Sequence, residues 1–206
     1  VSRNDLEKSI EEIDKNAEII EIESVGTKVA EGTVRNSIVA VSVASFFVMM
    51  YVLYAFRRLE KSYRFAFSAV LTLIHDVVLV TGIYALLGHI FGLQVNSVFI
   101  VALLTVIGYS VNDTIVIFDR IRENQIKFPD NKYSSNINIS INESIIRSLG
   151  TSITTLLVLF SMLILGGSTL REFIVVLILG VVVGTYSSIF IASQFLIIWE
   201  EGIKKD

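Results

Sequence analysis

Cysteine is absent from the 206-residue sequence, and proline occurs once. Without cysteine the chain has neither a disulfide framework nor a thiolate metal site. With only two histidines and no clustered histidine–glutamate pattern, we expect no metal and no cofactor. Charged residues are only 18% of the chain and the formal net charge is −3, which argues against nucleic-acid binding. The sequence also lacks a nucleophile–base set and a phosphate-binding loop, so we do not expect an enzyme.

Long hydrophobic runs dominate what is present. Hydrophobic residues make up 53% of the chain and the mean hydropathy is +0.68, which is typical of membrane proteins. A helix needs roughly 20 apolar residues to cross the hydrocarbon core of a bilayer. Five runs meet this requirement, at about 37–56, 65–87, 95–118, 149–165 and 173–199. We therefore predict an all-α integral membrane protein whose five-helix transmembrane domain spans residues 35–199.

Lysine and arginine are unevenly divided between the connecting segments. Segment 57–64 contains four, segment 119–147 contains five and the tail 200–206 contains two, whereas 88–94 contains none and 166–172 contains one. Basic loops of membrane proteins usually face the cytoplasm. The bias of eleven against one predicts a cytoplasmic C-terminal tail and places residues 1–34 outside.

The first 34 residues are polar and contain nine acidic and four basic residues. Residues 4–14 read as a short helix capped by Asn4, and residues 18–23 alternate like a half-buried strand. A lone helix–strand pair is too small to be stable, and this start does not resemble a signal peptide. We therefore expect residues 1–34 to be the end of an extracytoplasmic α/β domain, in a fragment of a longer polypeptide. The alternative is a disordered acidic lead-in.

Polar and small residues recur at helical spacing within four of the predicted helices. Side chains three or four positions apart share one helix face. The four sets are Ser68, Thr72, His75 and Asp76; Thr105, Gly108, Tyr109, Asn112 and Asp113; Arg147, Thr151, Thr154, Thr155 and Ser161; and Gly180, Gly184, Ser187 and Ser188. They predict a bundle with a hydrated or hydrogen-bonded interior. Close helix packing through small residues is enough to explain the last set.

Ionisable residues inside predicted spans are costly and usually functional. Asp76 lies near the middle of its run, while Asp113 and Arg147 lie near the cytoplasmic ends of theirs. Asp113 and Arg147 are expected at similar depth, so they form either a proton relay or a permanent ion pair that locks two helices. Arg147 alone has a further explanation, because its long side chain can reach the interface. For His75 the simpler explanation is a neutral ring hydrogen-bonded inside the bundle.

The segment "IGYSVNDTIVIFDRIREN" (107–124) closely resembles a membrane-span signature of the SecD/SecF family, on its SecF side. This family belongs to the resistance-nodulation-division superfamily. Similar matches run in the same order over about 23–199: "ESVGTKVAEG", "RFAFSAVLTLIHDVVL", "RSLGTSITTLLVLFSMLILGG" and "GVVVGTYSSIFIAS". The family has a further span and a ferredoxin-like extracytoplasmic domain ahead of these helices, so the resemblance implies that residues 1–34 are a remnant of that domain.

The resemblance also implies a function in protein export across the bacterial cytoplasmic membrane, driven by the proton gradient. The implied partners are SecD, the SecYEG translocon, the unfolded preprotein and membrane lipid. It implies a proton relay at Asp113 and Arg147 and favours that role over a lock. The secondary intramembrane polar residues are His75, Asp76, Tyr109, Asn112, Thr151 and Thr154, and the helix-packing residues are Gly180, Gly184 and Ser188. Two rival functions are a small-molecule exporter of the same superfamily and a non-transporting translocon scaffold.

Overall fold

The computed structural model describes residues 27–57, 59 and 61–202, and all regular secondary structure in this part of the chain is helical. The five helices are α2 (Thr27–Ala55), α3 (Ser62–Phe91), α4 (Ser97–Lys127), α5 (Tyr133–Leu165) and α6 (Ser168–Glu201). All five contain segments long and apolar enough to cross a membrane. The predicted all-α class with five long apolar helices is confirmed. The helix and strand predicted within residues 1–26 lie outside the described residues.

The helices end where the sequence contains residues that stop a helix. Gly92 ends α3 in the left-handed region, with φ 73°, a conformation that glycine adopts without strain. Asn96 then caps α4, because its side-chain oxygen accepts a hydrogen bond from the backbone N–H of Phe99 at 3.0 Å. The only proline, Pro129, follows Phe128 at the end of α4, and a residue before proline disfavours the helical conformation.

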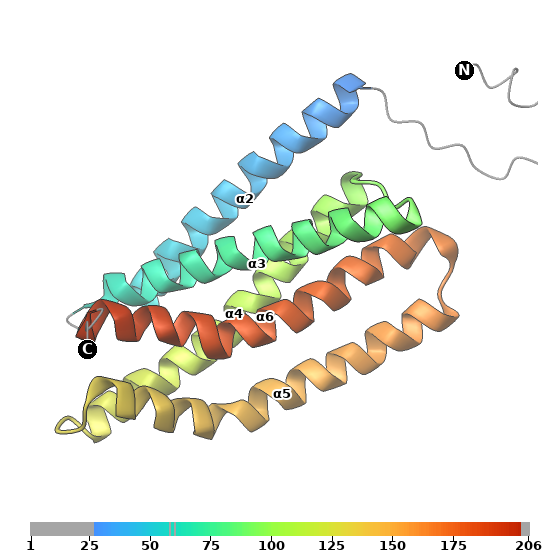
Figure 1. Ribbon diagram of the computed structural model, residues 1–206. Helices are drawn as coiled ribbons and strands as arrows, with labels where there is room; N and C mark the ends of the chain where they lie inside the picture. Colours follow the sequence, from blue (N-terminus) through green and yellow to red (C-terminus); the bar gives the residue numbers. More distant parts are fainter. Residues whose placement is uncertain (1–26, 58, 60, 203–206) are drawn as a thin grey trace, which may run out of the picture.

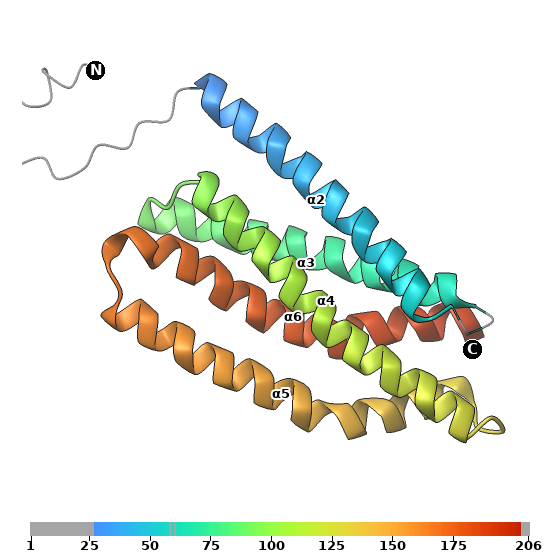
Figure 2. The ribbon, with the colours of Figure 1, turned by 180° about the vertical axis from the view of Figure 1, so that it is seen from behind.

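The helices alternate in direction and group their connections at two ends (Figures 1 and 2). The α2–α3 connection, the α4–α5 turn and the end of α6 lie at one end, which we call the basic end because most lysines and arginines of the described residues lie in or beside these connections. The α3–α4 and α5–α6 connections lie at the other end. Helix α6 lies between α3 and α5, and α4 crosses against it. Helix α2 contacts α3 and α4 towards the basic end and diverges from them towards its own beginning.

Helices α4 and α5 are longer than a bilayer requires. They contain 31 and 33 residues, or about 46 and 50 Å at 1.5 Å per residue, against a hydrocarbon core of about 30 Å. Segment 119–147, treated above as a loop, is therefore almost entirely helical, with only 128–132 outside the two helices. Buried Asn124 joins the two helices, donating to Ser140 Oγ at 2.9 Å and to Glu143 Oε2 at 2.8 Å.

Candidate functional site: buried carboxylates in a serine-lined interior

The interior contains two buried carboxylates, which lie on different helices. Asp76 on α3 is 2% exposed, and its Oδ2 accepts a hydrogen bond from Ser110 Oγ of α4 at 2.5 Å. The Nδ1 atom of half-buried His75 lies 3.1 Å from the other oxygen, Oδ1. Both oxygens of Asp76 thus have a partner, and the carboxylate joins α3 to α4.

Asp113 on α4 has a less complete environment. It is 7% exposed, and its Oδ1 accepts a hydrogen bond from Ser148 Oγ of α5 at 2.7 Å. Its Oδ2 is buried and has no hydrogen-bond partner among the described residues. Buried polar atoms are nearly always paired, so an unpaired carboxylate oxygen requires an explanation such as a bound proton or a partner from another chain.

Hydroxyl groups connect these carboxylates to α6. Ser188 Oγ lies 2.8 Å from Thr114 Oγ1 and donates to the backbone oxygen of Ser110 at 3.2 Å. On the α5 side, Ser152 Oγ lies 2.5 Å from Thr185 Oγ1 and accepts a hydrogen bond from the Tyr109 hydroxyl at 3.2 Å. The hydrogen-bonded interior predicted from the sequence is therefore present, and its polar contacts join α3, α4, α5 and α6.

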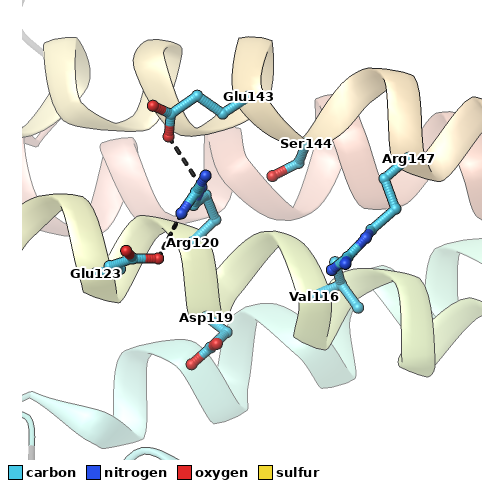
Figure 3. A pocket seen from close by; sticks show the side chains of 7 residues that line it. All are labelled: Val116, Asp119, Arg120, Glu123, Glu143, Ser144 and Arg147. Carbon is cyan, nitrogen blue, oxygen red and sulfur yellow. Dashed lines mark hydrogen bonds and ion pairs between the residues drawn. The ribbon is translucent and has the colours of Figure 1, made fainter.

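Arg147 does not pair with Asp113 in this structure. Its side chain is exposed and lines a cavity of about 360 Å³ between α4 and α5, with Asp119, Arg120, Glu123, Glu143, Val116 and Ser144. Figure 3 shows Arg147 reaching from α5 towards Val116 on α4, apart from the Arg120 group. Arg120 bonds Glu143 at 2.9 Å and Glu123 at 2.5 Å. Among the described residues, Ser148 occupies the place beside Asp113 that the sequence analysis gave to Arg147.

The cavity and the carboxylate are close along both helices. Val116, which lines the cavity, is three residues after Asp113, and Ser144 is one turn before Ser148. Ser144 is itself buried. The polar cavity at the basic end therefore begins about one helical turn from Asp113 and Ser148.

The predicted polar face of α5 points outward rather than into the bundle. Arg147, Thr151 and Thr154 are exposed, whereas Ser148 and Ser152 are buried. The exposed threonines satisfy their hydroxyls within their own helix: Thr154 donates to the backbone oxygens of Gly150 and Thr151. Thr151 and Thr154 lie three and six residues after Ser148, whereas the buried face of α5 recurs about every fourth residue. The two threonines therefore lie on another face of the helix. On α4, Asn112 is exposed as well.

Sequence reasoning missed the two serines that bond the carboxylates. Ser148 belongs to a row with Ser140, Ser144 and Ser152, and a serine at every fourth position for four turns is a signal of one buried polar face. Ser110 directly follows Tyr109, and only the crossing of α3 and α4 brings it to Asp76. The local sequence around Ser110 contains no comparable signal.

The small residues of α6 lie at its crossing with α4. A Cβ atom built on Gly180 would overlap the methyl groups of Val106 and come within 2.7 Å of its Cβ. One on Gly184 would lie 2.9 Å from the Cβ of Ser110. Real Cβ contacts are essentially never below 3.0 Å. The backbone of α6 thus approaches α4 as closely as glycine allows, next to the serine that bonds Asp76.

Taken together, the helices and the interior define a multi-pass membrane protein with ionisable groups inside its helix bundle. The family of protein export membrane proteins SecD/SecF, C-terminal part, matches residues 5–202. The chain is 43% identical over 185 residues to the protein translocase subunit SecF of Thermobaculum terrenum, covering 90% of this chain and 58% of that protein. It is 40% identical to the subunit SecDF of Thermus thermophilus, covering 89% of this chain and 24% of the relative.

The fold agrees with these sequence relationships. A crystal structure of SecDF, a translocon-associated membrane protein from Thermus thermophilus, superposes with a TM-score of 0.82 at 38% identity, covering 98% of this chain and 27% of that one. The super-membrane-facing form of SecDF gives a TM-score of 0.78 at 36% identity. The chain therefore belongs to the SecD/SecF family of protein export membrane proteins. It spans about three fifths of the SecF relatives it matches.

Proposed function

We propose that the chain is the membrane part of a SecF-type subunit that works with SecD to promote preprotein transfer across the bacterial cytoplasmic membrane. It acts beside the SecYEG translocon as a transport subunit, not an enzyme, and uses the proton gradient. The observation that supports this most directly is Asp113, a buried carboxylate with one unpaired oxygen about one turn from a polar cavity.

Asp113 suits reversible proton binding for a physical reason. A protonated carboxyl places no net charge in the interior, whereas the ionised form needs hydrogen bonds or a cation to offset its lost hydration. Ser148 offers one hydrogen bond, and the second oxygen awaits another partner. Arg147, exposed in the neighbouring cavity, is the one basic residue of α5 and would pair with Asp113 only after a rearrangement. Changes of charge at Asp113 would thereby alter the packing of α4 against α5.

The exposed polar face beside Asp113 is the proposed docking site for SecD. Thr105, Gly108 and Asn112 on α4, and Arg147, Thr151 and Thr154 on α5, are exposed within the candidate membrane-spanning helices. Polar and charged side chains rarely face lipid because hydrocarbon offers them no partners. The SecDF relatives, whose name joins the two subunits, favour SecD as the occupant. A partner on this face would also lie close to the unpaired oxygen of Asp113.

The function can be tested by replacing SecF in bacterial cells depleted of it. The full-length protein containing this chain, expressed with its own SecD, should restore export of a secreted preprotein. Collapse of the proton gradient should remove this gain in export. Restored export that is indifferent to the gradient would contradict the proposed energy source, and no restoration at matched membrane levels would contradict the proposed role.

The orientation proposed from the basic residues is tested by cysteine labelling, because the native chain has no cysteine. Asp130, in the α4–α5 turn, and Gln94, between α3 and α4, are both exposed. In intact cells a membrane-impermeant maleimide should label Gln94→Cys and leave Asp130→Cys unlabelled until the membrane is opened. The reverse pattern would place the basic end and the C-terminal tail outside.

A further inference from the structure

A second cavity lies at the basic end. It has a volume of about 290 Å³, near the lower end of ligand pockets. Residues from the α2–α3 connection, α3, α4, α5 and α6 line it: Leu59, Lys61, Arg64, Phe65, Gln125, Ile126, Tyr133 and Glu200. It shares no lining residue with the cavity that contains Arg147.

The charged residues of this cavity are unevenly matched. Lys61 Nζ lies 2.6 Å from Glu200 Oε1, and an Arg64 guanidinium nitrogen bonds Glu200 Oε2. One carboxylate thus lies between two cations, which leaves the described lining with one positive charge in excess. Beyond Lys61 and Arg64, the connecting sequence 57–64 contains two more basic residues and one acidic residue, which adds one further positive charge to this segment.

Two hydrogen-bond donors in the lining lack close acceptors. Arg64 Nε and Gln125 Nε2 are both buried and make no close hydrogen bond among the described residues, although each side chain also interacts with a neighbouring tyrosine, Arg64 with Tyr63 and Gln125 with Tyr133. They come from different helices, α3 and α4, and line the same cavity. A buried donor without an acceptor costs about 1–3 kcal/mol. Because both atoms are donors, a group that binds beside them needs acceptor atoms.

Two helices also begin at this cavity. Lys61 is the N-cap of α3, and Tyr133 is the first residue of α5. Neither helix has a side-chain cap or an acidic residue in its first turn. The start of a helix presents free backbone N–H groups and a partial positive charge, which favours anions. The helix starts and the orphan donors are independent observations that favour an anion.

We propose that this cavity binds one phosphate group at the membrane surface. A phosphate has several acceptor oxygens and one or more negative charges, so it can accept from Arg64 Nε and Gln125 Nε2 while balancing the excess cation. The neighbouring surface suits a lipid headgroup as the source, since Tyr63, Phe67 and Trp199 are exposed and Phe67 stacks on Trp199 with ring centroids 5.6 Å apart. Aromatic residues of this kind gather at membrane interfaces.

Binding is measured on the full-length protein in complex with SecD in detergent, with three probes. These are dioctanoyl phosphatidylglycerol, glycerol 3-phosphate and dioctanoylglycerol, which lacks phosphate. The phosphatidylglycerol Kd should be about tenfold weaker in Lys61→Gln and in Gln125→Leu, since a charge-assisted hydrogen bond is worth at least one factor of ten. Lys61→Arg keeps the charge and should retain binding. Lys127→Gln removes an exposed cation of α4 outside this lining and should leave binding unchanged.

The probes separate the two sources of phosphate. Tight binding of phosphatidylglycerol with weak binding of glycerol 3-phosphate assigns the site to a lipid headgroup, and comparable binding of both assigns it to soluble phosphate compounds. Equal binding of dioctanoylglycerol, or equal Kd values in wild type, Lys61→Gln and Gln125→Leu, would overturn the proposal. Thermal unfolding without added probe checks that each variant is folded. If Lys61→Gln is not folded, the result for Lys61→Arg decides the outcome.

Discussion

Gly180→Ala is expected to lower the stability of the bundle despite alanine being the better helix former. Helix propensity alone favours alanine over glycine by about 1 kcal/mol. The new methyl, however, would overlap Val106, whose branched side chain has one preferred rotamer in a helix and cannot turn away. Overpacking of this kind costs about 1–3 kcal/mol or more. The measurement is the midpoint of thermal unfolding in detergent, together with co-purification of SecD.

Gly82→Ala is the matched control, because a Cβ at Gly82 in α3 meets nothing within 4 Å. It should keep or slightly raise the unfolding midpoint. Val106→Ala combined with Gly180→Ala removes the two overlapping methyls and should recover part of the loss, while Gly180→Leu should be worse than Gly180→Ala. Equal midpoints for Gly180→Ala and Gly82→Ala would show that α4 and α6 separate easily, which would contradict the close approach of Gly180 to Val106.

The sequence was sufficient to predict the number and class of the helices, because crossing a bilayer demands long apolar runs whatever the neighbours are. Helix ends were predicted less well. Apolar runs end at the membrane surface, but hydrogen bonding continues α4 to Lys127 and starts α5 at Tyr133, well outside the predicted spans. Asn124, Ser140 and Glu143 explain this extension, since they bond the two helices beyond the apolar runs.

The candidate site was predicted in part, for a geometric reason. The spacing of Ser68, Thr72 and Asp76 identified the inward face of α3, and all three are buried. On α5 the same reasoning followed Arg147 and the threonines, although the buried face belongs to the serines. A helical wheel groups residues by face but does not say which polar face turns inward. That choice depends on neighbouring helices, and a face left exposed here can be covered by another subunit.

Asp113→Asn is expected to abolish gradient-dependent export and proton flux while leaving the complex with SecD intact. Asparagine keeps an oxygen that can accept the hydrogen bond from Ser148, so the α4–α5 contact survives, but it cannot bind and release a proton. Proton flux and export are measured with the full-length protein, SecD and matched membrane levels. Asp130→Asn is the control: the same change at an exposed residue of the α4–α5 turn, outside the lining of both cavities, should keep both activities.

Variants of Arg147 distinguish a proton relay from a permanent ion pair that locks two helices. Its side chain is exposed and unpaired with Asp113 in this structure, so Arg147→Gln should leave the unfolding midpoint nearly unchanged. If Arg147 assists proton transfer during the cycle, flux should nevertheless fall, with an intermediate result for Arg147→Lys because lysine keeps the charge but not the planar fork. A lock predicts instead that Asp113→Asn together with Arg147→Gln restores export. Near-normal flux in that double variant would rule out Asp113 as an obligatory proton carrier, whereas an assembled complex without flux would support it.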